Sequence, residues 1–164
     1  MKISEKTKTL TLAAMIAALY TALTMLSYAF GLDKGAIQLR LSEALAVLPA
    51  FSGAAVPGLF AGCFLSSLLC GAHPLDVVFG SLVTLFAAVL CRAMRGVLRF
   101  RFGFFLIPLP NILLNALLIP ILLIFVYGVP DAYSYLFLTV GIGELLTTGA
   151  LGSFLIFALP KKRL

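Results

Sequence analysis

The chain has 164 residues, of which 62% are hydrophobic and 11% are charged, and its mean hydropathy is +1.15. Soluble domains carry roughly a quarter charged residues, so this composition excludes an ordinary globular protein and indicates that lipid covers much of the chain. The formal net charge of +6 comes from clusters that flank apolar runs. Its placement argues against a nucleic-acid partner and for membrane lipid as the surroundings.

Apolar runs separated by Gly, Pro and charged residues predict six helices. The run 10–30 predicts a first membrane helix, and 42–51 predicts a helix too short to cross the bilayer upright. The other helices are expected at 54–70, 75–94, 104–127 and 133–159. The sequence therefore predicts an all-α integral membrane protein with six transmembrane helices, forming one domain over residues 1–164.

The basic residues predict an orientation for this bundle. Ten of the twelve Lys and Arg lie before the first helix, between the fourth and fifth, or after the last. With six crossings these clusters share one side of the membrane, which the positive-inside rule assigns to the cytoplasm. We expect both termini there, with the segment 31–41 forming an extended first outer loop.

The motifs of several protein classes are absent from the sequence. The chain lacks GxxxxGK[ST], HExxH and GxSxG, and His73 is its only histidine. The spacing of its three cysteines matches neither a metal site nor a disulfide framework. We expect no catalytic residue, no metal and no cofactor, so uphill transport would need an ion gradient or a partner protein.

A few polar residues interrupt the predicted helices, and polar groups at membrane depth indicate function. Glu144 is expected about 15 Å into the sixth helix, with Thr147 and Thr148 on its own face. Asn111 and Asn115 are one turn apart on the fifth helix, at comparable depth. The alternative for these amides is hydrogen bonding between helices. For Glu144 a purely structural role is the less favoured interpretation.

Two further carboxylates, Glu43 and Asp76, are predicted at the outer ends of their helices. Together with the deeper Glu144 they describe a polar bowl open to the outside, and the apolar inner halves of the helices argue against a pore. Asp76 could instead serve only as the N-cap of the fourth helix. His73, in the same outer turn, is expected to be solvated.

The stretch "AIQLRLSEAL" at 36–45 alternates polar Gln38, Arg40 and Ser42 with apolar residues. Period two predicts an extended segment rather than a helix, and extended backbone at a membrane face is tolerated where it covers a cavity. We interpret the segment as the lid of the bowl. The alternative is that Arg40 only pairs with Glu43 or Asp33 at headgroup level.

The first helix carries alanines at four-residue spacing, as Ala13/Ala17 and Ala14/Ala18. Small residues at this spacing allow another helix to approach closely. We interpret them as a surface for docking a partner protein.

These features, and above all "IQLRLSEALAVLPAF", resemble the QueT family of substrate-binding S components of energy-coupling factor (ECF) transporters. The resemblance covers about residues 8–160. It implies a transport subunit without enzymatic activity, in the cell membrane, whose partners are a transmembrane coupling protein and two cytoplasmic ATPases. It implies uptake of a queuosine precursor or related 7-deazaguanine, and toppling of the S component to release it. An S component for another vitamin-like ligand and a gradient-driven carrier are the alternatives.

The implied ligand can be matched to the polar residues. We expect Glu144 to accept hydrogen bonds from the guanine-like edge, and Asn111 or Asn115 to serve its carbonyl. Glu43 or Asp76 would pair with an aminomethyl cation, and Gln38 and Arg40 would form the lid. Exchanged carboxylate roles fit nearly as well. Aromatic rings for stacking are expected among Tyr20, Tyr28, Phe30 and Tyr135.

Overall fold

The computed structural model describes residues 4–32 and 37–159, a part of the chain that contains helices and no strand. Asp33, most of the basic residues at the two ends and the middle of the first loop fall outside the described residues. The elements in chain order are α1 (Glu5–Ala29), η1 (Leu41–Ala50), α2 (Ala55–Leu69), α3 (Pro74–Ala93), η2 (Met94–Arg99), α4 (Gly103–Leu106), α5 (Leu109–Phe125), α6 (Tyr133–Glu144), η3 (Leu145–Leu151) and α7 (Gly152–Ala158).

All six predicted runs form helical segments, and three of them depart from a simple α-helix. The second run is a 3₁₀ helix, η1. The fifth is divided into α4 and α5 near Pro108, and the sixth contains a π-helical turn, η3, directly after Glu144. The residues before η1 are not helical, and Arg40 has the extended backbone conformation that the period-two pattern predicts.

Four helical stretches are long and apolar enough to cross a membrane. They are Glu5–Ala29, Pro74–Arg99, Gly103–Phe125 and Tyr133–Ala158, while Leu41–Ala50 and Ala55–Leu69 are apolar but shorter. The described residues are thus all-helical with several potential spans. Crossing by all six segments, with both termini in the cytoplasm, stays a prediction.

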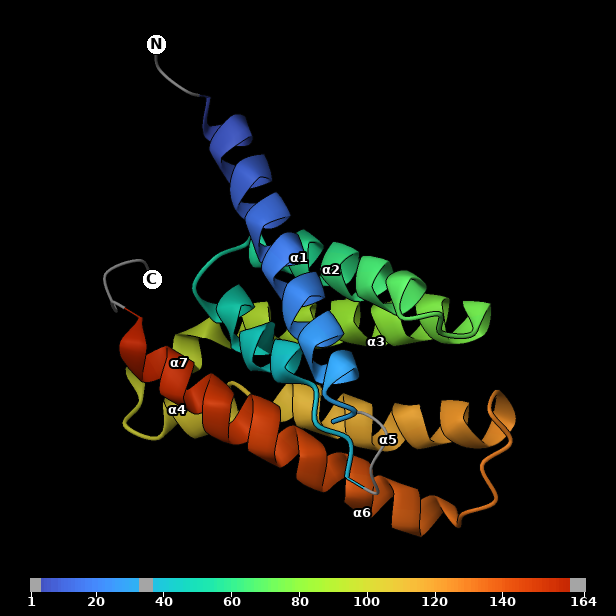
Figure 1. The fold of residues 1–164 in the computed structure, drawn as a ribbon. Coiled ribbons are helices and arrows are strands. Elements are labelled where there is room, and N and C mark those ends of the chain that lie inside the picture. The colour runs from blue at the N-terminus through green and yellow to red at the C-terminus, as the bar shows by residue number, and fades with distance from the viewer. Residues whose placement is uncertain (1–3, 33–36, 160–164) are drawn as a thin grey trace.

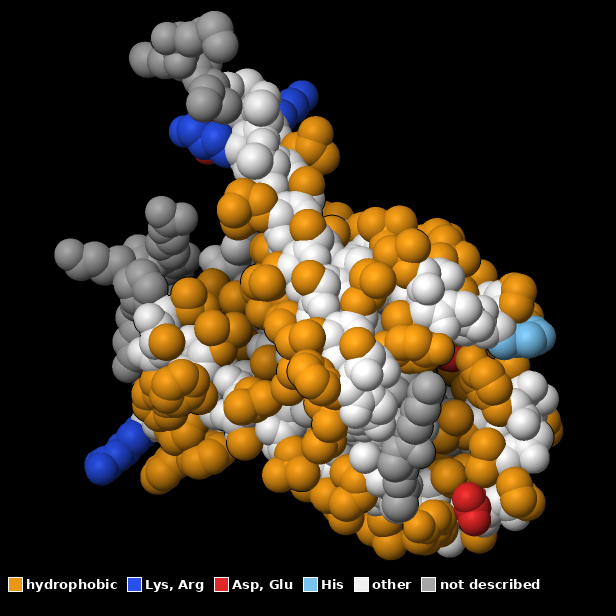
Figure 2. All heavy atoms as spheres, viewed as in Figure 1, with side chains coloured by type: hydrophobic (Ala, Val, Ile, Leu, Met, Phe, Trp, Pro, Cys, Tyr) orange, Lys and Arg blue, Asp and Glu red, His pale blue; other side chains and the backbone are white. Residues whose placement is uncertain are grey.

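The long helices form a layer that α1 crosses steeply. α2, α3, α5 and α6 lie side by side in that order, whereas the first turns of α1 stand clear of the bundle (Figure 1). Hydrophobic side chains cover much of the visible surface, and Lys side chains gather at the N-terminal end of α1 (Figure 2). An apolar surface of this kind is expected of a protein whose outer face contacts lipid.

The short helix η1 occupies the centre of the fold, where it packs against α1, α3, η3 and α7. A 3₁₀ helix of ten residues is unusual, because runs beyond three or four residues have poorer hydrogen-bond geometry. Its C-terminal carbonyls, those of Pro49 and Ala50, accept hydrogen bonds from Arg92 Nη1 at 3.2 and 3.4 Å. Tertiary contacts therefore hold η1 in place at an end that its own backbone does not satisfy.

Glycines on α2 allow α1 to approach closely. A Cβ at Gly58 would lie 2.7 Å from the carbonyl oxygen of Ala13, and one at Gly62 would lie 3.0 Å from that of Ala17. Half of the predicted docking face is therefore covered by the protein's own α2, which corrects that expectation. Ala14 and Ala18 are exposed.

Candidate functional site

Two carboxylates meet in the interior of the bundle, joined by one amide. Asn111 Nδ2 on α5 lies 2.9 Å from Glu43 Oε2 on η1 and 3.0 Å from Glu144 Oε2 on α6. Thr148 Oγ1, one turn after Glu144, donates to the same Glu144 oxygen at 2.7 Å. Glu43 is 3% exposed and Glu144 is 8% exposed. Four elements, α5, η1, α6 and η3, thus converge on one buried acidic cluster.

The position of Glu43 corrects the sequence-based expectation. Glu43 was expected at the outer rim with Asp76, but it lies in the core beside Glu144. The reason is that the first turn of η1 is buried under α1, so that Glu43 points inward. Asn111 does join helices by hydrogen bonds, as its alternative interpretation stated, and it does so within the acidic cluster.

Tyr20 also belongs to this cluster, although from the sequence its ring was expected only to stack on a ligand. Its hydroxyl donates to Glu43 Oε1 at 2.5 Å, and its side chain is 1% exposed. The available signal was the single Tyr in the middle of an apolar helix with Thr24 and Ser27 on the same face. Such a row favours polar contacts with another element of the bundle.

Several polar atoms around the cluster lack partners among the described residues. Asn111 Oδ1 and Asn115 Nδ2 are buried and make no hydrogen bond with residues 4–32 or 37–159. Glu144 Oε1 likewise accepts no bond from that part of the chain, since the bonds given by Asn111 and Thr148 end on Oε2. Unpaired buried polar atoms cost stability. Here Asn115 Nδ2 is a donor, and Asn111 Oδ1 and Glu144 Oε1 are acceptors, with which a ligand could form hydrogen bonds.

A small cavity, called the inner cavity here, adjoins the cluster, and a larger one, the outer cavity, shares part of its lining. The inner cavity has a volume of about 20 Å³ and is lined by Glu43, Glu144 and Asn115, among others. The outer cavity has a volume of about 370 Å³ and is lined on one side by Tyr28 and Thr24 of α1. Both cavities share Gln38, Arg40 and Ile119 as lining residues. The extended segment before η1 therefore lies at the boundary between them.

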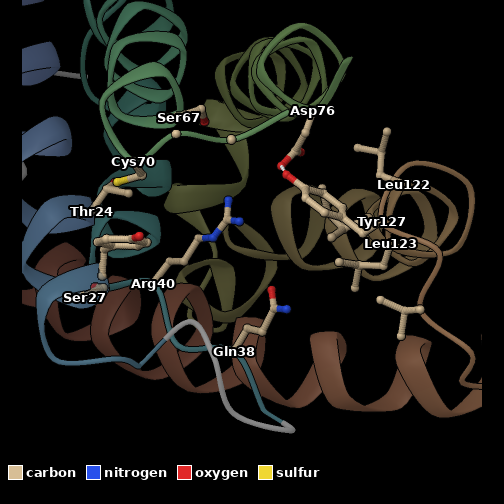
Figure 3. A pocket seen from close by; sticks show the side chains of 15 residues that line it. Thr24, Ser27, Gln38, Arg40, Ser67, Cys70, Asp76, Leu122, Leu123 and Tyr127 are labelled. Atoms are coloured by element: carbon tan, nitrogen blue, oxygen red, sulfur yellow. Dashed lines mark hydrogen bonds between the residues drawn. The ribbon is translucent and has the colours of Figure 1, made fainter. Parts of the chain in front are cut away.

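Arg40 and Asp76 give the outer cavity one cation and one anion. In Figure 3 the Arg40 guanidinium reaches into the cavity from the extended segment, and Asp76 enters from α3. Arg40 forms no ion pair with any described residue, so its proposed pairing with Glu43 is not found, and Asp33 lies outside that set. The guanidinium lines the outer cavity, where its N–H groups are of the kind that donate to a ligand acceptor.

Asp76 is not the N-cap of α3, which corrects the alternative given for it. The cap is His73, whose Nδ1 accepts from the Leu75 amide at 3.3 Å and which is exposed as expected. Asp76 Oδ2 instead accepts a bond from the Tyr127 hydroxyl at 2.7 Å. Partial burial and this bond to Asp76 raise the pKa of Tyr127. The phenol therefore stays a donor that holds Asp76 at the cavity wall.

Of the aromatic residues expected to stack on a ligand, Tyr28 lines the outer cavity. Tyr20 is buried against Glu43 and lines neither cavity, whereas Phe30 and Tyr135 are 72% and 48% exposed and line neither. Tyr127, which the sequence did not single out, also lines the outer cavity. A flat ligand would have phenol rings from α1 and from the loop after α5 within reach.

Comparison with known proteins now identifies the family. Residues 10–161 match the family described as the QueT transporter. The chain belongs to this family. No curated protein and no solved structure is similar enough to count as a match. The match covers nearly the whole chain, including every residue of the acidic cluster and both cavities.

Membership of the QueT transporter family, together with several long apolar helices, makes the chain a multi-pass membrane transport protein.

In this QueT protein the extended segment before η1 packs closely against α6 at a glycine. A Cβ at Gly143 would collide with the Gln38 carbonyl oxygen, so only glycine leaves room for the backbone there. Gly143 directly precedes Glu144, and the segment that carries Gln38 and Arg40 therefore crosses α6 at the acidic cluster.

Proposed function

We propose that the protein is the substrate-binding S component of an ECF-type importer, and that it captures a queuosine precursor or related 7-deazaguanine from outside the cell. The observation that carries the proposal is the pair of buried carboxylates, Glu43 and Glu144, which line a small cavity that shares Gln38, Arg40 and Ile119 with a larger one. Two carboxylates in one low-dielectric site favour a cationic partner. 7-Aminomethyl-7-deazaguanine is a flat base that carries such a cation.

The sizes of the two cavities suggest the orientation of the ligand. A volume of about 20 Å³ has room for roughly one water molecule, so the inner cavity suits an ammonium group and not a bicyclic base. We place the aminomethyl group there, donating to Glu43 and to the free Oε1 of Glu144. This assigns Glu144 to the cation and not to the guanine-like edge first expected for it.

The outer cavity then receives the base. Its volume of about 370 Å³ lies within the range of small-molecule sites. Asp76 would accept hydrogen bonds from the guanine-like donor edge, and Arg40 would donate to the carbonyl. Tyr28 and Tyr127 would pack on the ring. Gln38 and Arg40, at the boundary of the cavities, would close over the bound base as a lid.

The proposal includes a topology and partners. All six helical segments would form the transmembrane domain over residues 1–164, with both termini in the cytoplasm. A transmembrane coupling protein and two cytoplasmic ATPases would drive release, and the exposed Ala14 and Ala18 of α1 remain candidates for contact with the coupling protein. The chain itself would need neither a cofactor nor a catalytic residue.

Calorimetric titration of the purified, detergent-solubilised protein with 7-aminomethyl-7-deazaguanine, queuine and guanine tests the proposal. We expect tight binding of a deazaguanine and weak binding of guanine. In Glu144→Gln the affinity for the aminomethyl base should fall roughly 50-fold or more, because one partner of a buried charge pair is removed. Ser134→Ala, at the exposed start of α6, serves as a matched control and should bind as the wild type does.

Absence of deazaguanine binding by a folded wild-type protein would contradict the ligand and leave an S component for another small molecule. Binding that survives Glu144→Gln unchanged would contradict the position of the ammonium group. It would move recognition of the cation to Asp76 in the outer cavity.

A further inference from the structure

We propose that Tyr20 is a positioning residue, which holds the Glu43 carboxylate toward the inner cavity and thereby sets selectivity for a cationic ligand. The inference rests on the proposed function. Tyr20 lines neither cavity, yet its hydroxyl donates to Glu43 Oε1 at 2.5 Å. It therefore acts on a ligand through Glu43 and not by contact.

Glu43 has its two oxygens held from opposite sides of the bundle. Tyr20 of α1 binds Oε1, and Asn111 of α5 binds Oε2. A carboxylate oxygen has two lone pairs, so each oxygen keeps one direction for a further donor. With both bonds in place, these directions are fixed. Without the Tyr20 bond the carboxylate is held at one oxygen and can rotate away from the cavity.

The Tyr20 ring is itself held firmly. A Cβ at Gly62 of α2 would lie 2.7 Å from Tyr20 Cβ, so the two helices are in close contact at this point. Burial at 1% exposure leaves the ring no alternative position. The hydroxyl is thus presented by a rigid contact between α1 and α2, which is the property that a positioning group requires.

The same face of α1 also binds the two residues before Glu43. Thr24 Oγ1 donates to Ser42 Oγ at 2.8 Å, and Ser27 Oγ accepts from the Leu41 amide at 2.9 Å. Positions 20, 24 and 27 lie in one row along a helix. The row and the first turn of η1 therefore form a continuous contact. A shift of α1 along this contact would move Glu43 relative to Glu144.

The test compares Tyr20→Phe with Thr21→Val in the full-length protein. Tyr20→Phe removes the hydroxyl and keeps the buried ring. Thr21 is the neighbouring residue, and its Oγ1 bonds only to carbonyls of α1 and α2, at Ala17 and Gly62. Calorimetry measures the affinity of each variant for 7-aminomethyl-7-deazaguanine and for 7-cyano-7-deazaguanine, which lacks the cation.

We expect Tyr20→Phe to weaken binding of the aminomethyl base about tenfold and binding of the cyano base less than threefold, while Thr21→Val changes neither. An equal loss for both ligands would reveal a purely structural effect and overturn the inference, as would unchanged binding of the aminomethyl base. If the wild type binds neither deazaguanine, the proposed function fails first and the positioning role falls with it.

Ser27→Ala provides a second test that does not depend on how Tyr20→Phe folds. It removes the acceptor of the Leu41 amide, so hydrogen exchange at that amide should accelerate at least fivefold in the ligand-free protein. Because Ser27 also lines the outer cavity, the affinity for the aminomethyl base should fall at least threefold more than that for the cyano base. Unchanged exchange, or equal losses of affinity for the two ligands, would overturn the inference.

Discussion

Asn111 and Asn115 lie one turn apart on α5, but their amides have different surroundings. The Asn111 amide lies between the Glu43 and Glu144 carboxylates, whereas Asn115 Nδ2 has no partner among the described residues. Asn111→Leu should therefore lower the free energy of unfolding by about 3 kcal/mol, because two buried carboxylates lose their common donor. Thermal unfolding in detergent measures the loss.

Asn115→Leu is the matched control, and it should cost less than about 1 kcal/mol, because no bond to the described chain is broken. Because Asn115 lines the inner cavity, Leu would place an apolar side chain beside the ammonium group. Binding of the aminomethyl base should therefore weaken about tenfold, as measured by calorimetry. Equal stability losses in the two variants would contradict a structural role for Asn111 and a ligand-facing role for Asn115.

The sequence predicted which polar residues belong to the candidate site better than it predicted how these residues are arranged. Glu144, Asn111 and Thr148 follow from polarity at a given depth of a helix, because depth can be counted along the chain. Glu43 was placed wrongly, since the burial of η1 depends on packing against α1 that periodicity does not show. Tyr20 was missed as a hydrogen-bond donor because its partner lies 23 positions away.

The element that carries the lid depends on a single small residue. Gly143→Ala places a Cβ against the Gln38 carbonyl, a backbone atom that cannot move by a change of rotamer. We expect about 1–3 kcal/mol of destabilisation from overpacking, together with weaker ligand binding because Gln38 and Arg40 are displaced. Thermal unfolding and calorimetry on the same preparation measure both effects.

Gly141→Ala on the same helix is the control, because its Cβ would meet Ala116 Cβ at 3.6 Å, an ordinary contact. It should leave ligand affinity unchanged and alter stability by less than about 1 kcal/mol. If the two variants behave alike, the extended segment does not depend on the space at Gly143.

At the scale of elements, the existence of each helix could be predicted, but the type of helix could not. Apolar runs and breaks placed all six segments within a few residues of their observed ends. The 3₁₀ conformation of η1 and the π turn of η3 arise where these two elements pack against each other. Local sequence does not encode such tertiary contacts, and a run of apolar residues fits all three helix types.

The predicted topology of the whole molecule can be tested by labelling single cysteines, after replacement of the three native ones by alanine. Asp131 lies between α5 and α6, and Arg99 ends η2; both are exposed. With six crossings and cytoplasmic termini, a membrane-impermeant maleimide should label Asp131→Cys on intact cells. It should label Arg99→Cys only after permeabilisation. The reverse pattern would contradict the orientation drawn from the positive-inside rule.

The central claim is that Glu43 and Glu144 receive the cationic group of a 7-deazaguanine. The most direct measurement is the ratio of calorimetric dissociation constants for 7-cyano- and 7-aminomethyl-7-deazaguanine with the wild-type protein. The two ligands share the base and differ at the group that would enter the inner cavity. We predict that the aminomethyl base binds at least about 30-fold more tightly, a difference of roughly 2 kcal/mol. Equal affinities would contradict the account.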